Sequence, residues 1–240
     1  MSDPIFADPR LAAVYDAFDG ERADLTAYVT LADRLDARVV VDLGCGTGEL
    51  AIRLATHGRR VIGVDPAAAS LEVARSKPGA ATVTWVCGDS SAIPACRGDL
   101  ALMTGNVAQV FLTDTAWGSA LEDLRSALRP GGRLVFETRR PEARAWEAWA
   151  GRPPAVREIE GIGAVEQRFE LVDVAAPYVS FRWTYTFAVD GAVLVSDSTL
   201  RFRDRTEVED TLVAHGFGVV DVRDAPDRPG LEHVFIAQRD

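Results

Sequence analysis

Glycine and acidic residues alternate with other types in a short segment near residue 45, which reads Val41-Asp42-Leu43-Gly44-Cys45-Gly46-Thr47-Gly48-Glu49. Glycines at alternate positions let the backbone turn sharply and approach a ligand without Cβ clashes. A dinucleotide-binding fingerprint would need a glycine where this chain has Glu49. The carboxylates of Asp42 and Glu49 instead favour a ligand that is cationic or zwitterionic near this turn, which disfavours a nicotinamide-dependent dehydrogenase.

Two further aspartates follow later β-rich runs. Asp65 ends the run Arg60–Asp65, where a carboxylate can accept hydrogen bonds from both hydroxyls of a ribose. Asp89, in Gly88-Asp89-Ser90, can meet the exocyclic amine of an adenine. Acidic positions at three successive strand ends predict a nucleoside pocket without a phosphate clamp. Asp65 alone also fits a cap on the following helix, and Asp89 alone fits an ordinary turn.

The elements that must position these residues alternate between strand and helix. We expect strands at 39–41, 60–65, 83–86, 100–103 and 133–138, with helices at 49–55, 67–76 and 116–128 between them. The turn Arg129-Pro130-Gly131-Gly132 introduces the fifth strand. Such alternation predicts a mostly parallel, doubly wound sheet, in which ligands bind beyond the carboxyl ends of the strands.

The flanking segments have different patterns. Apolar spacing from 11 to 36, interrupted by Gly20, predicts two short helices. After a helical stretch around 143–149, antiparallel strands are expected between 156 and 203, including a hairpin closed by Asp190-Gly191. A helix at 206–215 with a capping box of Thr206 and Glu209 follows, and then strands at 218–223 and 233–237.

Four motifs occur in order: DLGCGTG at 42–48, GVD at 63–65, GDS at 88–90 and LRPGGRLVFET at 128–138. Together they resemble the class I S-adenosylmethionine-dependent methyltransferases over roughly 39–138. The resemblance implies an α/β fold: a Rossmann-like, seven-stranded, doubly wound sheet whose last strand is antiparallel, here with an antiparallel β insertion. It also implies S-adenosyl-L-methionine as the cofactor and S-adenosyl-L-homocysteine as the product.

The resemblance assigns roles to particular residues. Asp42 and the glycine turn surround the methionine part of the cofactor, Asp65 holds the ribose, and Asp89 lies at the adenine end. Tyr15 resembles an N-terminal tyrosine that many small-molecule members fold over the methionine moiety, although its apolar helical face also fits the core. The expected cofactor-binding residues are Tyr15, Asp42, Gly44, Cys45, Gly46, Gly48, Asp65, Pro66, Asp89, Ser90, Thr104 and Asn106.

The end of the fourth strand, Met103-Thr104-Gly105-Asn106, lacks the Asn/Asp-Pro-Pro-aromatic tetrad of methyltransferases that act on base amines in nucleic acids. The candidate catalytic residues are Asn106, Glu137 and Tyr15. The candidate acceptor-binding residues are Gln109, Arg139, Trp146, Trp149, Tyr178 and Trp183. Structural alternatives stay open: a left-handed backbone at Asn106, a paired surface charge at Glu137, and helix packing for Trp146 and Trp149.

The composition excludes several function classes. The 240 residues contain 26 Lys+Arg and 36 Asp+Glu, a net charge of −10 that disfavours nucleic-acid and anionic-membrane partners. The three cysteines and three histidines have no metal-ligand spacing, so no metal is expected. Without a signal-like N-terminus or an apolar run of spanning length, a cytoplasmic protein is expected, either a monomer or a homodimer.

These observations favour one function and leave a second open. The first is methyl transfer from S-adenosylmethionine to a nitrogen or oxygen of a small-molecule acceptor, by in-line displacement. The second is a non-catalytic protein that binds S-adenosylmethionine or S-adenosylhomocysteine as a regulatory or structural ligand. In either case we expect a single methyltransferase domain over 1–240: N-terminal helices at 1–36, a core at 37–140 and 206–240, and an inserted helix with a β cap at 141–205.

Overall fold

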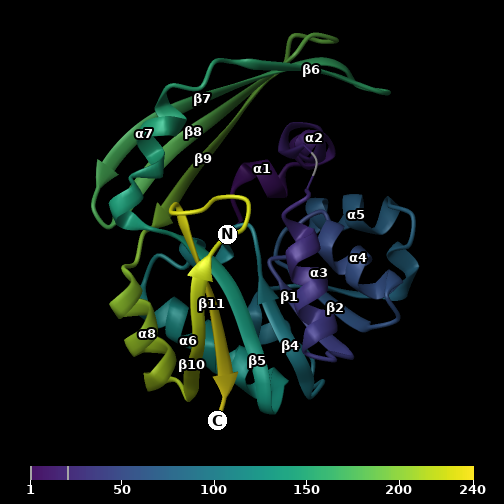
Figure 1. The fold of residues 1–240 in the computed structure, drawn as a ribbon. Helices are drawn as coiled ribbons and strands as arrows, with labels where there is room; N and C mark the ends of the chain where they lie inside the picture. Colours follow the sequence, from purple (N-terminus) through teal and green to yellow (C-terminus); the bar gives the residue numbers. More distant parts are fainter. Residues whose placement is uncertain (1, 21) are drawn as a thin grey trace.

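The computed structural model describes residues 2–20 and 22–240, and its centre is a seven-stranded sheet (Figure 1). The strand order is β10-β11-β5-β4-β1-β2-β3. The strands are β1 (Val39–Leu43), β2 (Arg60–Asp65), β3 (Val83–Cys87), β4 (Gly98–Met103), β5 (Leu128–Arg139), β10 (Phe217–Asp224) and β11 (Glu232–Arg239). β11 pairs antiparallel with both β5 and β10, while β1 to β5 pair in parallel. The expected Rossmann-like sheet with an antiparallel last strand is confirmed.

A second sheet of four antiparallel strands curves over one end of the first (Figure 1). It consists of β6 (Ala155–Ile159), β7 (Gly163–Ala175), β8 (Tyr178–Phe187) and β9 (Val193–Arg201), in that order. Asp190 and Gly191 lie in the β8–β9 connection, as the hairpin signal predicted. The expected antiparallel β insertion is therefore present.

Helices cover both faces of the central sheet. The α-helices are α1 (Pro4–Ala7), α2 (Pro9–Asp19), α3 (Leu25–Arg34), α4 (Glu49–Thr56), α5 (Ala68–Ser76), α6 (Asp114–Ala127), α7 (Ala145–Ala150) and α8 (Arg205–Ala214). Short 3-10 helices are η1 (Ala80–Thr82), η2 (Ser90–Ala92), η3 (Val107–Val110) and η4 (Pro141–Ala143). The buried strand residues alternate between the two faces, so α3 and α4 pack on one and α6 and α8 on the other.

The N-terminal helices join the two sheets. Ile5, Leu11 and Val14 of α1 and α2 are buried against Val165 and Tyr185 of the second sheet. The Ile5 amide donates to the Ser196 hydroxyl at 2.9 Å, and the Phe6 carbonyl accepts from Ser70 at the start of α5, at 3.0 Å. The α1–α2 pair is therefore held between the β cap and the core.

Two local predictions are wrong. The helix α8 is capped by Asp204, whose carboxylate accepts from the Glu207 amide at 2.8 Å, and not by Thr206. Glu209 forms an ion pair with Arg205 at 2.7 Å, because it lies four residues along the helix from that arginine. The turn at 129–132 does not precede β5 but lies inside it, as an irregularity where the pairing with β4 shifts.

The helices within residues 2–20 and 22–240 include none with both the length and the apolar character that a membrane span requires.

Candidate functional site

The glycine-rich turn between β1 and α4 has a backbone that other residues would strain. Gly44 has φ of +74°, and a Cβ there would lie 2.5 Å from Cγ2 of Val107. Gly48 has φ of +81°, and its Cβ would meet Trp85 at 2.5 Å. Gly46 also has a positive φ, with open space beside it. The turn is therefore left-handed at three positions, and the close approach of Val107 and Trp85 requires glycine at two of them.

A cavity of about 600 Å³ lies beside this turn, at the carboxyl ends of the parallel strands and beneath β9. Its size is in the range of small-molecule sites, ~300–1,000 Å³. Ten of the twelve expected cofactor-binding residues line it: Tyr15, Asp42, Gly44, Cys45, Gly46, Asp65, Pro66, Asp89, Ser90 and Thr104. Gly48 and Asn106 do not; Gly48 packs on Trp85, and Asn106 lies behind the cavity wall.

Asp65 holds the turn in place. One carboxylate oxygen accepts from the Gly46 amide at 2.8 Å, and the other accepts from the Ala67 amide at 2.8 Å. Ala67 is itself the N-cap of α5, which has no side-chain cap, so Asp65 supports the turn before the helix and does not cap it. Each carboxylate oxygen keeps a second lone pair toward the cavity. Burial raises the pKa of Asp65, and the two backbone hydrogen bonds oppose that rise.

Asp42 differs from Asp65 in having no partner. It is only 2% exposed, lines the cavity, and accepts no hydrogen bond from the described residues. Burial, with the nearby charge of Asp65, raises the pKa of Asp42 to about 7. The charge of Arg22 opposes this rise, but Arg22 is paired with Asp19 and Asp24. A buried carboxylate without an ion-pair partner is costly, so the geometry favours a cationic group of a ligand next to Asp42.

The remaining polar groups along the cavity are less constrained. Asp89 is exposed, and its carboxylate accepts from the amide and the hydroxyl of Ser91, which lowers the pKa of Asp89. Ser90 donates to Asp123 at 2.7 Å. Cys45 is a free thiol whose pKa is raised by burial, so it is not activated as a nucleophile.

Tyr15 lies over the cavity on α2, with its ring 5.5 Å from that of Phe6 on α1. Burial raises the pKa of the Tyr15 phenol, and the charge of Asp19 adds to the rise. The phenol therefore stays protonated near neutral pH. Tyr15 can form a wall or donate a hydrogen bond, but this environment does not suit a general base.

The other two catalytic candidates do not line the cavity. Glu137 is 4% exposed and accepts from the Tyr28 hydroxyl and, at 2.6 Å, from the Gly105 amide. The surface-charge alternative for Glu137 is therefore wrong. Asn106 has φ of +63° and donates through Nδ2 to Glu232 at 3.1 Å. Both residues fix the backbone after β4, which carries Thr104 and Gly105 into the cavity wall.

The six acceptor-binding candidates also lie outside the lining of this cavity. Arg139 donates to Gln109 at 3.0 Å and lies 4.8 Å from the ring centroid of Trp149. Both Trp149 and Trp183 contact Phe169, and both Trp146 and Trp149 contact Phe202. Tyr178 donates to the Leu112 carbonyl at 3.1 Å, and Leu112 lines the cavity. These residues join α7, the second sheet and the end of β5.

Residues that the sequence did not single out complete the cavity. Asp3 and Phe6 from the N-terminal segment, Arg22, and Asp197 and Ser198 of β9 all line it. Burial raises the pKa of Asp3, while a hydrogen bond with the Ser198 hydroxyl opposes that rise. The Asp3-Pro4 start of α1 is a helix-start signal, but nothing in the sequence places it opposite β9.

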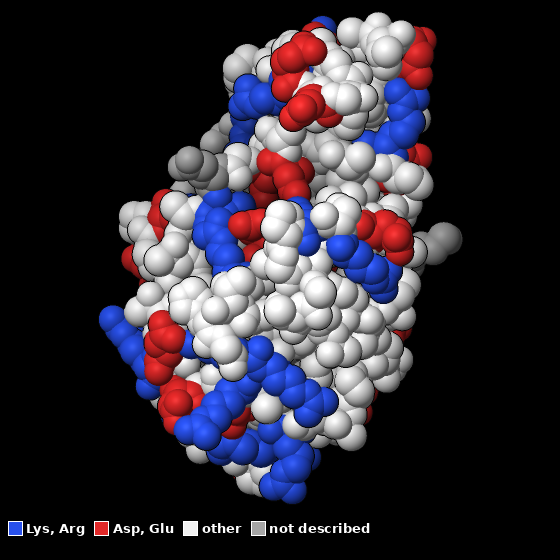
Figure 2. All heavy atoms as spheres, turned by 90° about the vertical axis from the view of Figure 1, so that its right-hand side faces the viewer, with Lys and Arg blue, Asp and Glu red and all other residues white. Residues whose placement is uncertain are grey.

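The charge around the cavity is one-sided. Asp3, Asp42, Asp65 and Asp89 line it, and its lining arginine, Arg22, is already paired with Asp19 and Asp24, both at 2.8 Å. On the face that carries α4 and α5, basic side chains gather instead at the lower end, where the parallel strands begin (Figure 2). The cavity therefore attracts cations.

Comparisons with known proteins agree with this geometry. Residues 40–132 match a family described as methyltransferase domain. The chain is 31% identical over 146 residues to the biotin biosynthesis bifunctional protein BioHC of Cellvibrio japonicus, covering 58% of this chain and 28% of that protein. It is 33% identical over 130 residues to the malonyl-[acyl-carrier protein] O-methyltransferase of Yersinia pestis, covering 54% of this chain and 47% of the relative. The chain thus spans less than half the length of either relative.

A solved structure extends the similarity to the second sheet. The sugar N-methyltransferase KedS8 from Streptoalloteichus is 18% identical, with a TM-score of 0.77, covering 94% of this chain and 92% of that one. At this identity the likeness concerns the fold. Residues 40–132 are therefore similar to a methyltransferase domain, and the chain as a whole has a Rossmann-like fold similar to that of the solved sugar N-methyltransferase.

Proposed function

We propose that this protein transfers a methyl group from S-adenosylmethionine to a small-molecule acceptor. The observation that carries the proposal is Asp42: a 2% exposed carboxylate that accepts no hydrogen bond from residues 2–20 and 22–240, beside a left-handed glycine turn, in a cavity lined by further carboxylates. Such a site favours a cationic nucleoside over an anionic one. The methyltransferase family match over 40–132 supports the same ligand.

The residues present fit this cofactor. Asp42 can receive positive charge, and the open space beside Gly46 lets a ligand approach the backbone of the turn. Asp65 keeps lone pairs for ribose hydroxyls, and Asp89 is exposed at the adenine end. When bound, S-adenosylmethionine supplies an activated methyl group on a sulfonium sulfur. Tyr15 and Phe6 would exclude water from that end of the cavity.

We further propose that the acceptor atom is nitrogen. The acceptor end of the cavity is formed by η3, β9 and the N-terminal segment, where Asp3 lies beside Ser198. A protonated amine is attracted by the carboxylates of Asp3 and Asp197, and it must lose a proton before it reacts. The raised pKa of Asp3 suits a group that accepts this proton. Residues 141–205 would roof the acceptor, since β9 contributes Asp197, Ser198 and Thr199.

The test is turnover on a defined panel. We would incubate the protein with S-adenosylmethionine and matched pairs of small amines and alcohols, and measure S-adenosylhomocysteine formation and the mass gain of one methyl group on the acceptor. Transfer to amines supports the proposal, and transfer to alcohols alone contradicts the assignment of nitrogen. Tight cofactor binding without transfer to any acceptor would favour the alternative of a non-catalytic cofactor-binding protein.

A matched variant pair separates the role of Asp3 from its contribution to folding. Asp3→Asn keeps the shape and hydrogen-bonding capacity of the side chain but cannot accept a proton, whereas Ser198→Ala removes its partner. If Asp3 accepts the proton, Asp3→Asn should lower kcat by at least tenfold at neutral pH and by less at high pH, where the amine is already deprotonated. An unchanged pH profile would contradict this role.

A further inference from the structure

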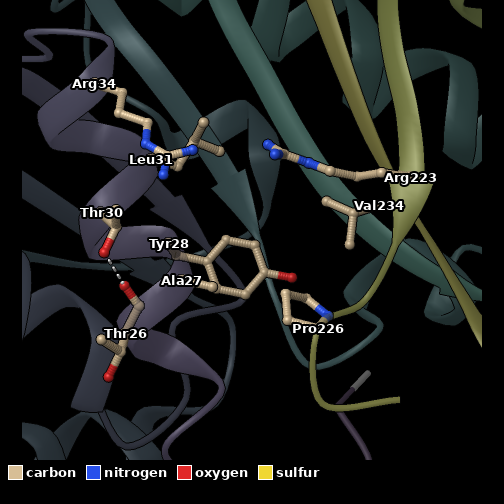
Figure 3. Close-up of a pocket in the computed structure, with 9 residues that line it drawn as sticks. All are labelled: Thr26, Ala27, Tyr28, Thr30, Leu31, Arg34, Arg223, Pro226 and Val234. Atoms are coloured by element: carbon tan, nitrogen blue, oxygen red, sulfur yellow. Dashed lines mark hydrogen bonds between the residues drawn. The ribbon is translucent and has the colours of Figure 1, made fainter. Parts of the chain in front are cut away.

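A second cavity, of about 260 Å³, lies outside the one described above, between α3 and the residues that join β10 to β11. Figure 3 shows the side chains around it. They are Thr26, Ala27, Tyr28, Thr30, Leu31, Arg34, Arg223, Pro226 and Val234. None of these nine residues is acidic, although the chain carries a net charge of −10.

Two arginines from different elements converge on this cavity. Arg34 extends from α3 and Arg223 from β10, and their guanidinium groups point toward one another (Figure 3). Two like charges that face each other repel, and an anion between them removes that repulsion. A single guanidinium can donate two parallel hydrogen bonds to a carboxylate, and two that converge can hold one carboxylate from both sides.

The carboxylates nearest in sequence do not neutralise the pair. Asp33 forms an ion pair with Arg59, and Asp224 forms one with Arg140. Asp221 reaches Arg223 at 3.8 Å, which is a long ion pair between two exposed side chains. Among the residues that the structure describes, no carboxylate oxygen lies within 4.0 Å of Arg34.

Structural roles account for only part of this arrangement. Arg34 lies in the last turn of α3, where a cation is favourable beside the helix carbonyls. That explains the presence of a positive charge but not its direction toward Arg223. Thr30 adds no free donor, because its hydroxyl donates to the Thr26 carbonyl at 2.8 Å. The guanidinium groups are therefore the charged recognition groups of the cavity.

The rest of the lining is apolar. Leu31, Pro226 and Val234 form walls, and the ring of Tyr28, which is 4% exposed, lies between them (Figure 3). The Tyr28 hydroxyl already donates a hydrogen bond to the Glu137 carboxylate. We infer that this cavity binds a small carboxylate with an apolar body, held by Arg34 and Arg223 at its charged end and by the apolar walls along its length.

Benzoate and benzamide form a matched pair of probes, because they have nearly the same shape and differ in charge. We would titrate each into the full chain at low ionic strength and follow backbone amide shifts by NMR. Benzoate should bind at least about tenfold more tightly than benzamide, the discrimination given by one pair of charge-assisted hydrogen bonds. Its shifts should concentrate at residues 26–34 and 223–234, and added salt should weaken its binding.

The variants Arg34→Gln, Arg223→Gln and the double variant should lower benzoate affinity toward that of benzamide. Arg38→Gln is the matched control, since Arg38 is a neighbouring exposed arginine outside the cavity, and it should leave benzoate binding unchanged. All three positions carry exposed side chains, so folding should be retained in all four variants, and circular dichroism would check it. Equal affinity for the two probes, benzoate shifts centred on residues 42–49, or undiminished binding in the double variant would each overturn the proposal.

Discussion

The carboxyl edge of the central sheet contains two groups of buried carboxylates that differ in the partners they have within the protein. Beside β1 and β2, Asp42 accepts no hydrogen bond within the part of the chain that the structure describes, and Asp65 accepts from two backbone amides. Beside β5 and β11, Glu137 accepts from Tyr28, and Glu232 is contacted by Arg228 at 2.8 Å and Arg139 at 3.5 Å. We call the first pair the open group and the second the closed group.

The difference shows how burial alone misleads a search for functional residues. All four carboxylates are less than 8% exposed, but those of the closed group are neutralised or hydrogen-bonded by other side chains of the protein. The open group leaves its negative charge to be matched from outside the chain. We therefore expect substitutions in the closed group to affect mainly the stability of the fold, and substitutions in the open group to affect mainly ligand binding.

The largest effect is expected at Glu232. The change Glu232→Ala leaves the half-buried Arg139 without its carboxylate and removes the acceptor of Asn106. Because Glu232 itself is buried, breaking this network should lower the free energy of unfolding by about 3 kcal/mol. Urea denaturation would measure this, with Glu147→Ala on the exposed face of α7 as the control. A loss of unfolding free energy below ~1 kcal/mol would mean that the contacts of the closed group contribute little to the stability of the fold.

Asp65→Ala should weaken binding of S-adenosylhomocysteine by ~1.5–3 kcal/mol, because charge-assisted hydrogen bonds to the ligand are lost. Since Asp65 also holds the Gly46 and Ala67 amides, a smaller loss of stability should accompany this change. Calorimetry on the folded variant gives the affinity. Asp65→Asn separates the two roles, as it keeps an acceptor but not the charge. Unchanged affinity in both variants would contradict membership of Asp65 in the open group.

The pH dependence of ligand binding provides a third test. The pKa of Asp42 is about 7 in the ligand-free protein, so Asp42 is mostly protonated at pH 6 and mostly ionised at pH 8. If the ionised form binds the cationic ligand, affinity should rise by about tenfold between these pH values. Asp42→Asn should bind more weakly and lose this dependence. Calorimetry at both pH values would measure the affinities. If the affinity of Asp42→Asn rose between pH 6 and pH 8 as much as that of the unaltered protein, the role of Asp42 would be refuted.

The same pKa predicts a stability effect of defined sign. The folded-state pKa of Asp42 lies above its unfolded value, so the native state retains a proton that the unfolded state releases. The contribution of Asp42 to stability is therefore most favourable at about pH 4 and declines as the pH rises toward 7. Asp42→Asn should flatten this decline in urea denaturation series, and bound ligand should flatten it as well.

The smallest effect is expected for Tyr28→Phe. It removes one donor to Glu137, while the Gly105 amide still donates to the other oxygen. Stability should fall by about 1 kcal/mol, and affinity for S-adenosylhomocysteine should stay within a factor of two or so. Thermal and urea unfolding together with calorimetry would measure both. A large loss of ligand affinity would show that the closed group shapes the cavity directly and would weaken the comparison.

The sequence predicted the central sheet closely because its signals are local. β-branched runs, glycine turns and helical apolar spacing place strands and helices within a few residues of their observed ends, as at Arg60–Asp65. The cap of α8 was misplaced because two candidate capping residues, Asp204 and Thr206, lie two positions apart, and only the backbone geometry decides between them.

The sequence by itself determined the glycine turn and the order of the strand-end aspartates, since chain order and parallel pairing bring Asp42, Asp65 and Asp89 to one edge. Tertiary structure alone decided which polar residues are free to meet a ligand. Glu137 is paired by Tyr28, 109 positions away, and Asp3 reaches the cavity because α1 packs beneath β9. Pairing at such separations depends on how whole elements pack, and no local pattern records it.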